Sequence, residues 1–315
     1  MQPSVVQSIE SVPQVLLGPL LDEEAAMWAD DLRWSFAPSR QRLEAALLEG
    51  TVHGFVAMDE IGACAYATFS SHEDQGVIGS FFSSKRARNL GLEEVLIRRI
   101  LARLLDRPLR VVDCQTLFSS KPSLKEPFAT CGFESAARLY MSLERDTWAA
   151  RATAAASPYR SKPTHRTDIR SIARLIFDAH ERSRFQDASS SFDTLDSCAR
   201  ILRQIILDEV CGAFDSAGSR RIEEGGRALA ACLLTWPLPG VAHVSEVATA
   251  PGERRKGLAR HCLTESLRSA FEGGGATQAT LSVTASNQAA LGLYESIGFV
   301  PKVSYQSHVL RSPLR

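Results

Sequence analysis

The sequence predicts an α/β protein built from two domains of similar fold. Three observations lead to this prediction: the chain length, the alternation of strand-like and helix-like segments, and an internal repeat. The 315 residues are about twice the length of a typical domain. Runs of β-branched and apolar residues alternate with segments in which apolar residues recur at helical spacing.

The internal repeat is anchored at two points in each half of the chain. Gly91 and Gly132 are 41 positions apart, and so are Gly257 and Gly298. The shared offset of 166 residues also aligns the apolar positions of the helical segments after Gly91 and Gly257. Because this spacing and an Arg-x-x-Gly-Leu pattern agree together, duplication of one domain is a better explanation than chance.

The first domain is predicted to span residues 1–145. Two helices are expected within 13–49, where amphipathic runs flank an Ala-Pro-Ser break. The next segments indicate strands at 51–60, 63–71, 76–84 and 110–118, with a helix at 90–105. Residues 146–163 are rich in Ala, Ser and Pro and lack periodicity, so they are predicted to be a linker.

The second domain is predicted to span residues 164–315. A helix capped by Thr167 or Asp168 extends to Ala179, and a second helix covers 198–207. The later segments indicate strands at about 209–215 and 228–236, strand–loop–helix–strand–helix over 241–299, and a last strand at 304–311.

Composition narrows the class of protein. The chain is 44% apolar, and its 36 Lys and Arg balance its 36 Asp and Glu, so no net charge favours nucleic acid or an acidic membrane. No apolar run is long enough for a bilayer, and the N-terminus lacks a secretion signal. Seven scattered cysteines indicate reduced thiols, so we expect a cytoplasmic protein. The seven histidines lack metal-ligand spacing, so no metal is expected.

A basic loop after the strand at 241–250 has the features of an anion-binding site. The basic run 254–257 ends in glycine and precedes a helix that begins at Leu258. Backbone N–H groups at a helix N-terminus attract anions, and glycine lets a ligand approach the backbone closely. Leu258 and Ala259 replace the Lys and Ser/Thr of an ATP-binding P-loop, and no G-x-G-x-x-G motif is present. The loop therefore predicts a phosphate or pyrophosphate site of another kind.

The last helix of this stretch places three side chains on one face. Asn287, Leu291 and Tyr294 are spaced i, i+4 and i+7. Ser286 or Asn287 is expected to cap this helix, and Gly298 to end it.

Two motifs in this stretch resemble those of the GNAT superfamily of N-acyltransferases. Arg254-x-x-Gly257-x-Ala259 is similar to the acyl-CoA loop, whose consensus is Gln/Arg-x-x-Gly-x-Gly/Ala. The run from Asn287 to Phe299 is similar to the second motif, Asn-x-x-Ala-x-x-Leu-Tyr-x-x-x-Gly-Phe. The resemblance covers the chain well from about His165 to its end, and weakly before that. It implies two tandem GNAT-like domains of α+β type, each a mixed, mostly antiparallel sheet flanked by helices.

The resemblance implies an N-acyltransferase that moves an acetyl group from acetyl-CoA, or another short acyl-CoA, to a primary amine by direct attack in a ternary complex. Tyr294 would protonate the leaving thiolate, and Glu246 is the candidate general base. The acceptor would be a small-molecule or protein amine, with residues 180–193 forming its wall, and the enzyme a monomer or homodimer. The implied cofactor-binding residues are Val247, Ala248, Thr249, Arg254, Arg255, Lys256, Gly257, Leu258, Ala259 and Asn287.

Each candidate residue also has a structural interpretation. Asn287 alone is a helix cap, Tyr294 alone is a core or interface residue, and the basic run alone is a solvated turn. Glu246, with His243 nearby, is either a solvated residue at a sheet edge or a general base. The alternative function is a non-catalytic acyl-CoA-binding sensor or scaffold, and a nucleotide-phosphate binder is a weaker third.

The first domain is predicted to have lost its chemistry. The offset of 166 aligns Tyr294 with Phe128, which has no proton to donate. The same offset aligns Glu246, Asn287 and Ala259 with Ser80, Lys121 and Glu93. A carboxylate at the last of these positions would repel a bound anion, so we expect a structural or substrate-shaping role for this domain.

Overall fold

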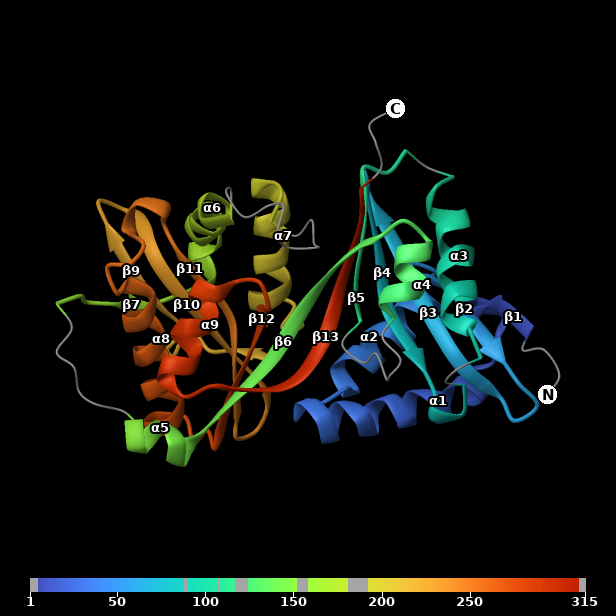
Figure 1. The fold of residues 1–315 in the computed structure, drawn as a ribbon, viewed down its shortest axis with the longest axis horizontal. Helices are drawn as coiled ribbons and strands as arrows, with labels where there is room; N and C mark the ends of the chain where they lie inside the picture. Colours follow the sequence, from blue (N-terminus) through green and yellow to red (C-terminus); the bar gives the residue numbers. More distant parts are fainter. Residues whose placement is uncertain are drawn as a thin grey trace. The chain divides into compact units, whose positions relative to one another are not determined.

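The computed structural model describes residues 5–87, 90–106, 108–116, 124–151, 158–180 and 192–311. These residues form two compact units, each with strands between layers of helices (Figure 1). The first unit comprises Met1–Ala137 and Tyr305–Arg315, and the second comprises Arg138–Ser304. The mixed α/β fold predicted from the sequence is confirmed.

The strands of the first unit lie in the order β1-β2-β3-β4-β5-β13. β4 and β5 are parallel, and the other neighbouring pairs are antiparallel. The strands are β1 (Val5–Ser8), β2 (His53–Met58), β3 (Ala63–His72), β4 (Gln75–Ser83), β5 (Val111–Thr116) and β13 (Val300–Arg311). The helices are α1 (Gln14–Met27), α2 (Ala37–Leu48), α3 (Leu92–Leu104) and α4 (Lys125–Thr130).

Side-chain alternation divides the first unit into two cores. Phe55 and Ala57 on β2 pack with the apolar face of α3, whereas Val56 between them packs with α1 and α2. The buried residues of α3 recur every three or four positions, as its sequence predicts.

The strands of the second unit lie in the order β6-β12-β11-β10-β9-β7, and β8 also pairs with β10. β11 and β12 are parallel, and the other pairs are antiparallel. The strands are β6 (Glu134–Glu144), β7 (Lys162–Pro163), β8 (Ala213–Phe214), β9 (Arg220–Glu224), β10 (Arg227–Leu238), β11 (Val241–Thr249) and β12 (Gln278–Thr284). The helices are α5 (Arg145–Arg151), α6 (Ile169–His180), α7 (Leu195–Ile206), α8 (Leu258–Arg268) and α9 (Gln288–Ile297).

β10 and β11 separate two cores of the second unit. Leu233 and Ala248 pack with residues of α6 and α7, whereas Cys232 and Val244 pack with residues of α8 and α9. We call these two sides of the sheet the α6/α7 face and the α8/α9 face (Figure 1).

Each half of the sequence ends in a strand that lies in the other unit. Residues 138–144 of β6 pair with β12, from Arg138 opposite Thr284 to Glu144 opposite Gln278. Residues 306–311 of β13 pair with β5 in the first unit. The compact units therefore do not follow the predicted domains 1–145 and 164–315, whose boundaries remain a prediction about the duplicated sequence.

The structure differs from the predicted linker in its first residues. Residues 145–151 form α5, and Trp148 is buried there with its ring stacked on Phe271, at 5.9 Å between centroids. One buried aromatic in so short a helix leaves no period to detect. Residues 152–157 lie outside the described residues.

The segment between the predicted strands at 209–215 and 228–236 contains a further strand, β9, which the sequence did not predict. Arg221 of this strand forms an ion pair with Asp168 at 2.7 Å. The next residue, Ile222, is buried in the core. The expected strand at 209–215 shortens to β8, whereas β13 begins four residues before the predicted last strand. In the described residues, no helix combines the length and apolar character needed to cross a membrane.

A carboxyl group lies inside the first unit. Glu24 on α1 is 3% exposed, and its carboxyl oxygens accept hydrogen bonds from the Tyr66 hydroxyl at 2.6 Å and from Trp28 Nε1 at 3.3 Å. Burial raises the pKa of Glu24 from 4.5 to about 7, although both hydrogen bonds oppose the shift.

We predict that Glu24 makes the protein less stable as pH rises from about 4.5 to about 7. In this window the unfolded carboxyl group has lost its proton while the folded one retains it, at a total loss on the order of 3 kcal/mol. Glu24→Gln should flatten this part of the pH profile and should be more stable than the wild type at pH 8. Denaturant unfolding of both proteins from pH 4 to 8 measures the difference, and parallel profiles would contradict the assignment.

Candidate active site

β11 and β12 separate at one end of the second unit. Their parallel register runs from Val241 opposite Gln278 to Val244 opposite Leu281 and stops there. β11 continues to Thr249 along β10, with a bulge at Ser245, and β12 continues to Thr284 along β6. On the side that faces β12, residues 245–249 of β11 are therefore not paired with that strand. Their backbone N–H and C=O groups on this side need other hydrogen-bonding partners.

The basic loop follows this end of β11 and leads into α8. Gly257 has φ +87°, and a Cβ atom placed on it would meet nothing within 4 Å. The first intrahelical bond runs from His261 N to Gly257 O at 2.9 Å, so the amides of residues 258–260 precede the helical ladder. These donors and the positive end of the helix dipole can hold an anion beside the exposed glycine.

The side chains of the loop are partly engaged within the protein. The Arg254 guanidinium donates to the carbonyl oxygen of Ala179, near the end of α6. Lys256 Nζ donates to Glu253 at 3.0 Å, and the Tyr159 hydroxyl donates to Lys256 O at 2.8 Å. Arg255 is exposed with φ +63°. The groups of this loop that could hold an anion are consequently its backbone amides, with the three cations nearby.

Asn287 is the N-cap of α9. Its Oδ1 accepts a hydrogen bond from Ala290 N at 3.2 Å, and the helix ends at Gly298 with φ +117°. The structural interpretation of Asn287 is therefore confirmed. A cap at this point also lies just after the end of β12, beside the separated strands.

Tyr294 lies on α9 and is 7% exposed, with its ring edge-on to Phe299 at 6.0 Å between centroids. It belongs to the core on the α8/α9 face, so its structural interpretation also holds. Burial, followed by the charge of Glu246 and by Cys232, raises the pKa of the phenol well above its usual range, while Arg138 lowers it. A phenol that keeps its proton at neutral pH can serve as a donor.

Glu246 is the carboxylate at the separated end of β11. It is half-buried, and it lies opposite Leu233, which packs on the α6/α7 face. His243 on the same strand is buried, with Nδ1 2.9 Å from Thr280 Oγ1, and burial lowers its pKa to about 3. His243 is consequently neutral at pH 7, which leaves Glu246 as the anionic candidate base.

The separated strand also offers a polar atom for a ligand. Thr249 Oγ1 is buried and has no hydrogen-bond partner among the described residues. Together with the open glycine and the first-turn amides of α8, it fits an extended ligand that carries amides and a diphosphate. Residues 247–249, 257–259, 287 and 294 thus frame one end of the second unit.

Arg138, a residue of this region, was not predicted from the sequence. It lies on β6 opposite Thr284, and its charge acts on the phenol of Tyr294. The apolar alternation in residues 139–143 could have indicated β6 as a strand, but not its partner.

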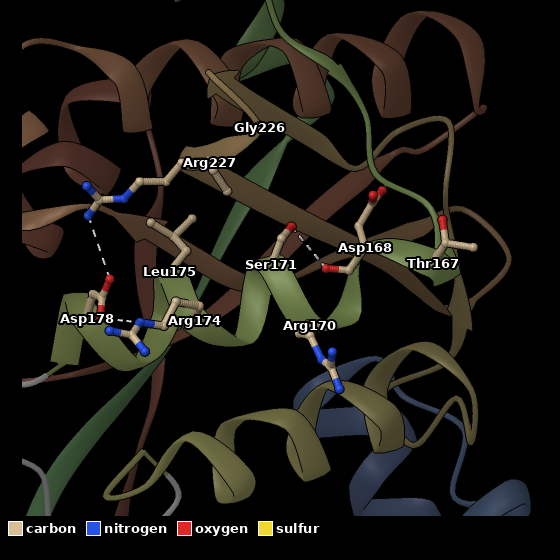
Figure 2. Close-up of a pocket in the computed structure, with 10 residues that line it drawn as sticks. Thr167, Asp168, Arg170, Ser171, Arg174, Leu175, Asp178, Gly226 and Arg227 are labelled. Atoms are coloured by element: carbon tan, nitrogen blue, oxygen red, sulfur yellow. Dashed lines mark hydrogen bonds and ion pairs between the residues drawn. The ribbon is translucent and has the colours of Figure 1, made fainter.

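A crevice of about 420 Å³ lies beside α6, and none of the predicted site residues lines it. Figure 2 shows the residues that line this crevice. Arg174 and Arg227 both turn toward Asp178, at 3.0 and 3.7 Å, and Ser171 Oγ donates to the Asp168 carbonyl. Its lining holds no Cys, His or Tyr, and its two carboxylates, Asp168 and Asp178, both form ion pairs with arginine side chains. The lining residues are Thr167, Asp168, Arg170, Ser171, Arg174, Leu175, Asp178, Gly226, Arg227 and Ala228.

The corresponding part of the first unit is filled by aromatic side chains. The parallel register of β4 and β5 stops at Ile78 opposite Cys114, as it stops between β11 and β12. Phe128 is fully buried there, and it stacks on His308 of β13 at 3.9 Å between ring centroids. Lys121, which the offset aligns with Asn287, lies outside the described residues.

No cluster of three or more metal-ligating side chains occurs among the residues that the structure describes.

Comparison with known proteins agrees with this geometry. Residues 179–299 match the model of the acetyltransferase (GNAT) family, and this range includes every predicted site residue. The family consists of acyl-CoA-dependent acetyltransferases, so the match supports acyl transfer in general. No curated protein matches the chain.

Several solved structures share the fold over nearly the whole chain. A tandem GNAT protein from the clavulanic acid biosynthesis pathway has a TM-score of 0.61 at 12% identity, covering 98% of this chain and 99% of its own. A GCN5-related N-acetyltransferase from Sphaerobacter thermophilus has a TM-score of 0.63 at 18% identity, covering 99% and 96%. A putative acetyltransferase from Pyrococcus horikoshii has a TM-score of 0.56 at 12% identity, covering 100% and 91%. Residues 179–299 thus match the GNAT acetyltransferase family model, and the chain as a whole shares the fold of these solved structures, including that of a tandem GNAT protein.

Proposed function

We propose that the second unit transfers an acetyl group from acetyl-CoA, or another short acyl-CoA, to a primary amine. The observation that supports this most strongly is that Glu246 lies on β11 beyond the end of its pairing with β12, and that its charge acts on the phenol of Tyr294 on α9. The first turn of α8 follows the same end of β11 in the sequence. A proton acceptor, a proton donor and an anion site there meet the needs of thioester aminolysis.

Binding of the donor would use the backbone more than side chains. The diphosphate would accept hydrogen bonds from the amides of residues 258–260. The amide-bearing arm would pair with residues 247–249, where β11 lacks a partner on its β12 side, and Thr249 Oγ1 would gain a hydrogen-bond partner. Arg255 and Lys256 would add attraction for phosphate at the exposed edge of the loop.

The chemical step would need two proton transfers. Glu246 would take a proton from the acceptor amine, directly or through water, as its nitrogen attacks the thioester carbonyl. A backbone N–H of β11 would stabilise the oxyanion. The carbon–sulfur bond would then break, and Tyr294 would protonate the sulfur. The phenol is suited to this role because it remains protonated at neutral pH.

We propose that the first unit lacks this activity. Phe128 occupies the position of Tyr294 and fills the space with a ring stacked on His308. The acceptor could be a small-molecule amine or a protein amine. Most of the segment expected to form the acceptor wall, residues 181–191, lies outside the described residues. A monomer or homodimer in the cytoplasm remains our expectation.

The alternative is an acyl-CoA-binding sensor without turnover. It is favoured by the structural roles that Asn287 and Tyr294 already have, as a helix cap and as a core residue. Release of free thiol from acetyl-CoA in the presence of an amine library separates the two functions, since a sensor releases none.

Tyr294→Phe should reduce kcat about a hundred- to ten-thousand-fold while the Kd for acetyl-CoA changes less than about threefold. The phenyl ring keeps the contact with Phe299 but has no proton for the sulfur. Thiol release and equilibrium binding measure the two quantities. Tyr305→Phe, at a buried tyrosine of the first unit, is the control and should keep its activity. Equal losses in turnover and binding would contradict the role as an acid.

Glu246→Gln should lower kcat/KM by a similar factor and should abolish the rise of kcat/KM with pH that ionisation of the base produces. The amide has nearly the same shape as the carboxyl group but cannot accept the proton of the amine. A pH series of initial rates tests this. Glu272→Gln, an exposed residue beyond α8, should retain the wild-type profile. An unchanged profile in Glu246→Gln would exclude it as the base.

Gly257→Ala should raise the Kd for acetyl-CoA about tenfold, because an L-residue at φ +87° is strained and the first-turn amides would shift. Gly252→Ala is a matched control, since its Cβ also meets open space but its φ is not positive. Calorimetric titration with acetyl-CoA compares them, and equal affinities would argue against an anion site at these amides.

A further inference from the structure

One charged side chain near Tyr294 has no role in the proposed reaction. Arg138 lies on β6, the strand that ends the first half of the sequence, yet it belongs to the second unit. Its placement can be worked out from the register of β6 and from the two cores of that unit.

Arg138 points to the α6/α7 face of the sheet. Its neighbour Leu139 lies opposite Val283, and Met141 lies opposite Leu281, and all four pack with the core on the α8/α9 face. Because side chains alternate along a strand, Arg138 and Tyr140 point to the other face.

Glu246 points to the same face. Its partner Leu233 and the residue two positions on, Ala248, both belong to the core with α6 and α7. Arg138 and Glu246 consequently lie on one face of the second unit, on either side of the point where β11 and β12 separate.

Side chains of β6 and β11 meet across β12 on this face. The ring of Tyr140 stacks with His243 at 6.4 Å between centroids and 14° between planes. Arg138 is two positions from Tyr140 along β6, toward the separated end, and Glu246 lies beyond His243 in the same direction. The two charged side chains therefore lie on the same face of the sheet, toward the end where β11 and β12 separate.

Both charges act on the phenol of Tyr294. Burial is the largest cause of its raised pKa, Glu246 raises the pKa further, and Arg138 lowers it. Cys232 on β10 also raises this pKa, and Tyr140 on β6 and His243 on β11 are further titratable groups that lie on the same face as Arg138 and Glu246. Burial keeps His243 neutral, with a pKa of about 3.

We propose that Arg138 is a positioning residue of the second unit's site, a cation supplied by the first half of the sequence that balances Glu246 and stabilises negative charge on the leaving sulfur. This inference rests on the proposed acyl transfer. When the carbon–sulfur bond breaks, its electron pair goes to sulfur, and the proton of Tyr294 follows. The guanidinium lowers the energy of the thiolate before that proton arrives. The first copy would thus contribute to the reaction through its last strand without turnover of its own.

The test uses the full chain with Arg138→Met, which keeps much of the side-chain length without the charge, and Arg138→Lys, which restores a charge. Arg170→Met, at an exposed arginine on α6, is the control. Two quantities are measured: kcat against pH with acetyl-CoA and an amine, and ionisation of the thiol of bound coenzyme A, followed by thiolate absorbance. The second readout needs no turnover.

Arg138→Met should lower kcat at least about tenfold and raise the pKa of the bound thiol by about one unit, with the Kd for acetyl-CoA and the melting temperature nearly unchanged. Arg138→Lys should recover most of the lost kcat and most of the shift in the pKa of the bound thiol, and Arg170→Met should match the wild type. An unshifted thiol pKa in Arg138→Met, or a Lys variant as impaired as Met, would overturn the role of Arg138. A wild-type protein that binds coenzyme A but releases no thiol from acetyl-CoA would instead contradict the proposed function. The titration of the bound thiol would still show whether Arg138 stabilises the thiolate. Failure of the wild type to bind coenzyme A would reject both.

Discussion

The separation of β11 from β12 beyond Val244 is the constraint on which the candidate site depends. Backbone groups inside a sheet are normally satisfied by the neighbouring strand, so a strand that loses its neighbour needs another hydrogen-bonding partner. Here the bulge at Ser245 turns β11 while β10 continues to hold it, and α8 begins a few residues later with the amides of residues 258–260 outside its helical ladder. The unpaired edge of β11 and the amides proposed to bind an anion are therefore only a few residues apart in the sequence.

The sequence was informative where function imposes a local pattern. The glycine before α8, the cap at Asn287 and the position of Tyr294 on α9 all follow from residue types at fixed spacing, and the structure has each of them on the expected element. The partners of the loop side chains were not predictable in this way. A short motif predicts an arginine at position 254. The hydrogen bond from its guanidinium to the Ala179 carbonyl depends on the position of the C-terminal end of α6, which the motif does not give.

The pairing of the strands was harder to predict from the sequence than the residues of the candidate site. β6 was not predicted at all, and the sequence could not indicate that it pairs with β12, more than a hundred residues later. Periodicity shows which residues share a face, but the choice of neighbour is decided by the whole fold. β9 was missed for a different reason, since its charged residues resemble a loop until Arg221 is seen to pair with Asp168. The duplicated sequence thus predicted two units correctly, while the exchange of last strands between them became visible only in the structure.

The central claim is that coenzyme A binds along the separated part of β11 and at the first turn of α8. Hydrogen exchange of the backbone amides, measured with and without coenzyme A, tests it most directly, because it reports on each segment regardless of the acceptor amine. The account predicts slower exchange in residues 245–249 and 257–260 on adding coenzyme A, with no change in the crevice beside α6. Protection confined to that crevice or to the first unit, or no protection at saturating coenzyme A, would contradict it.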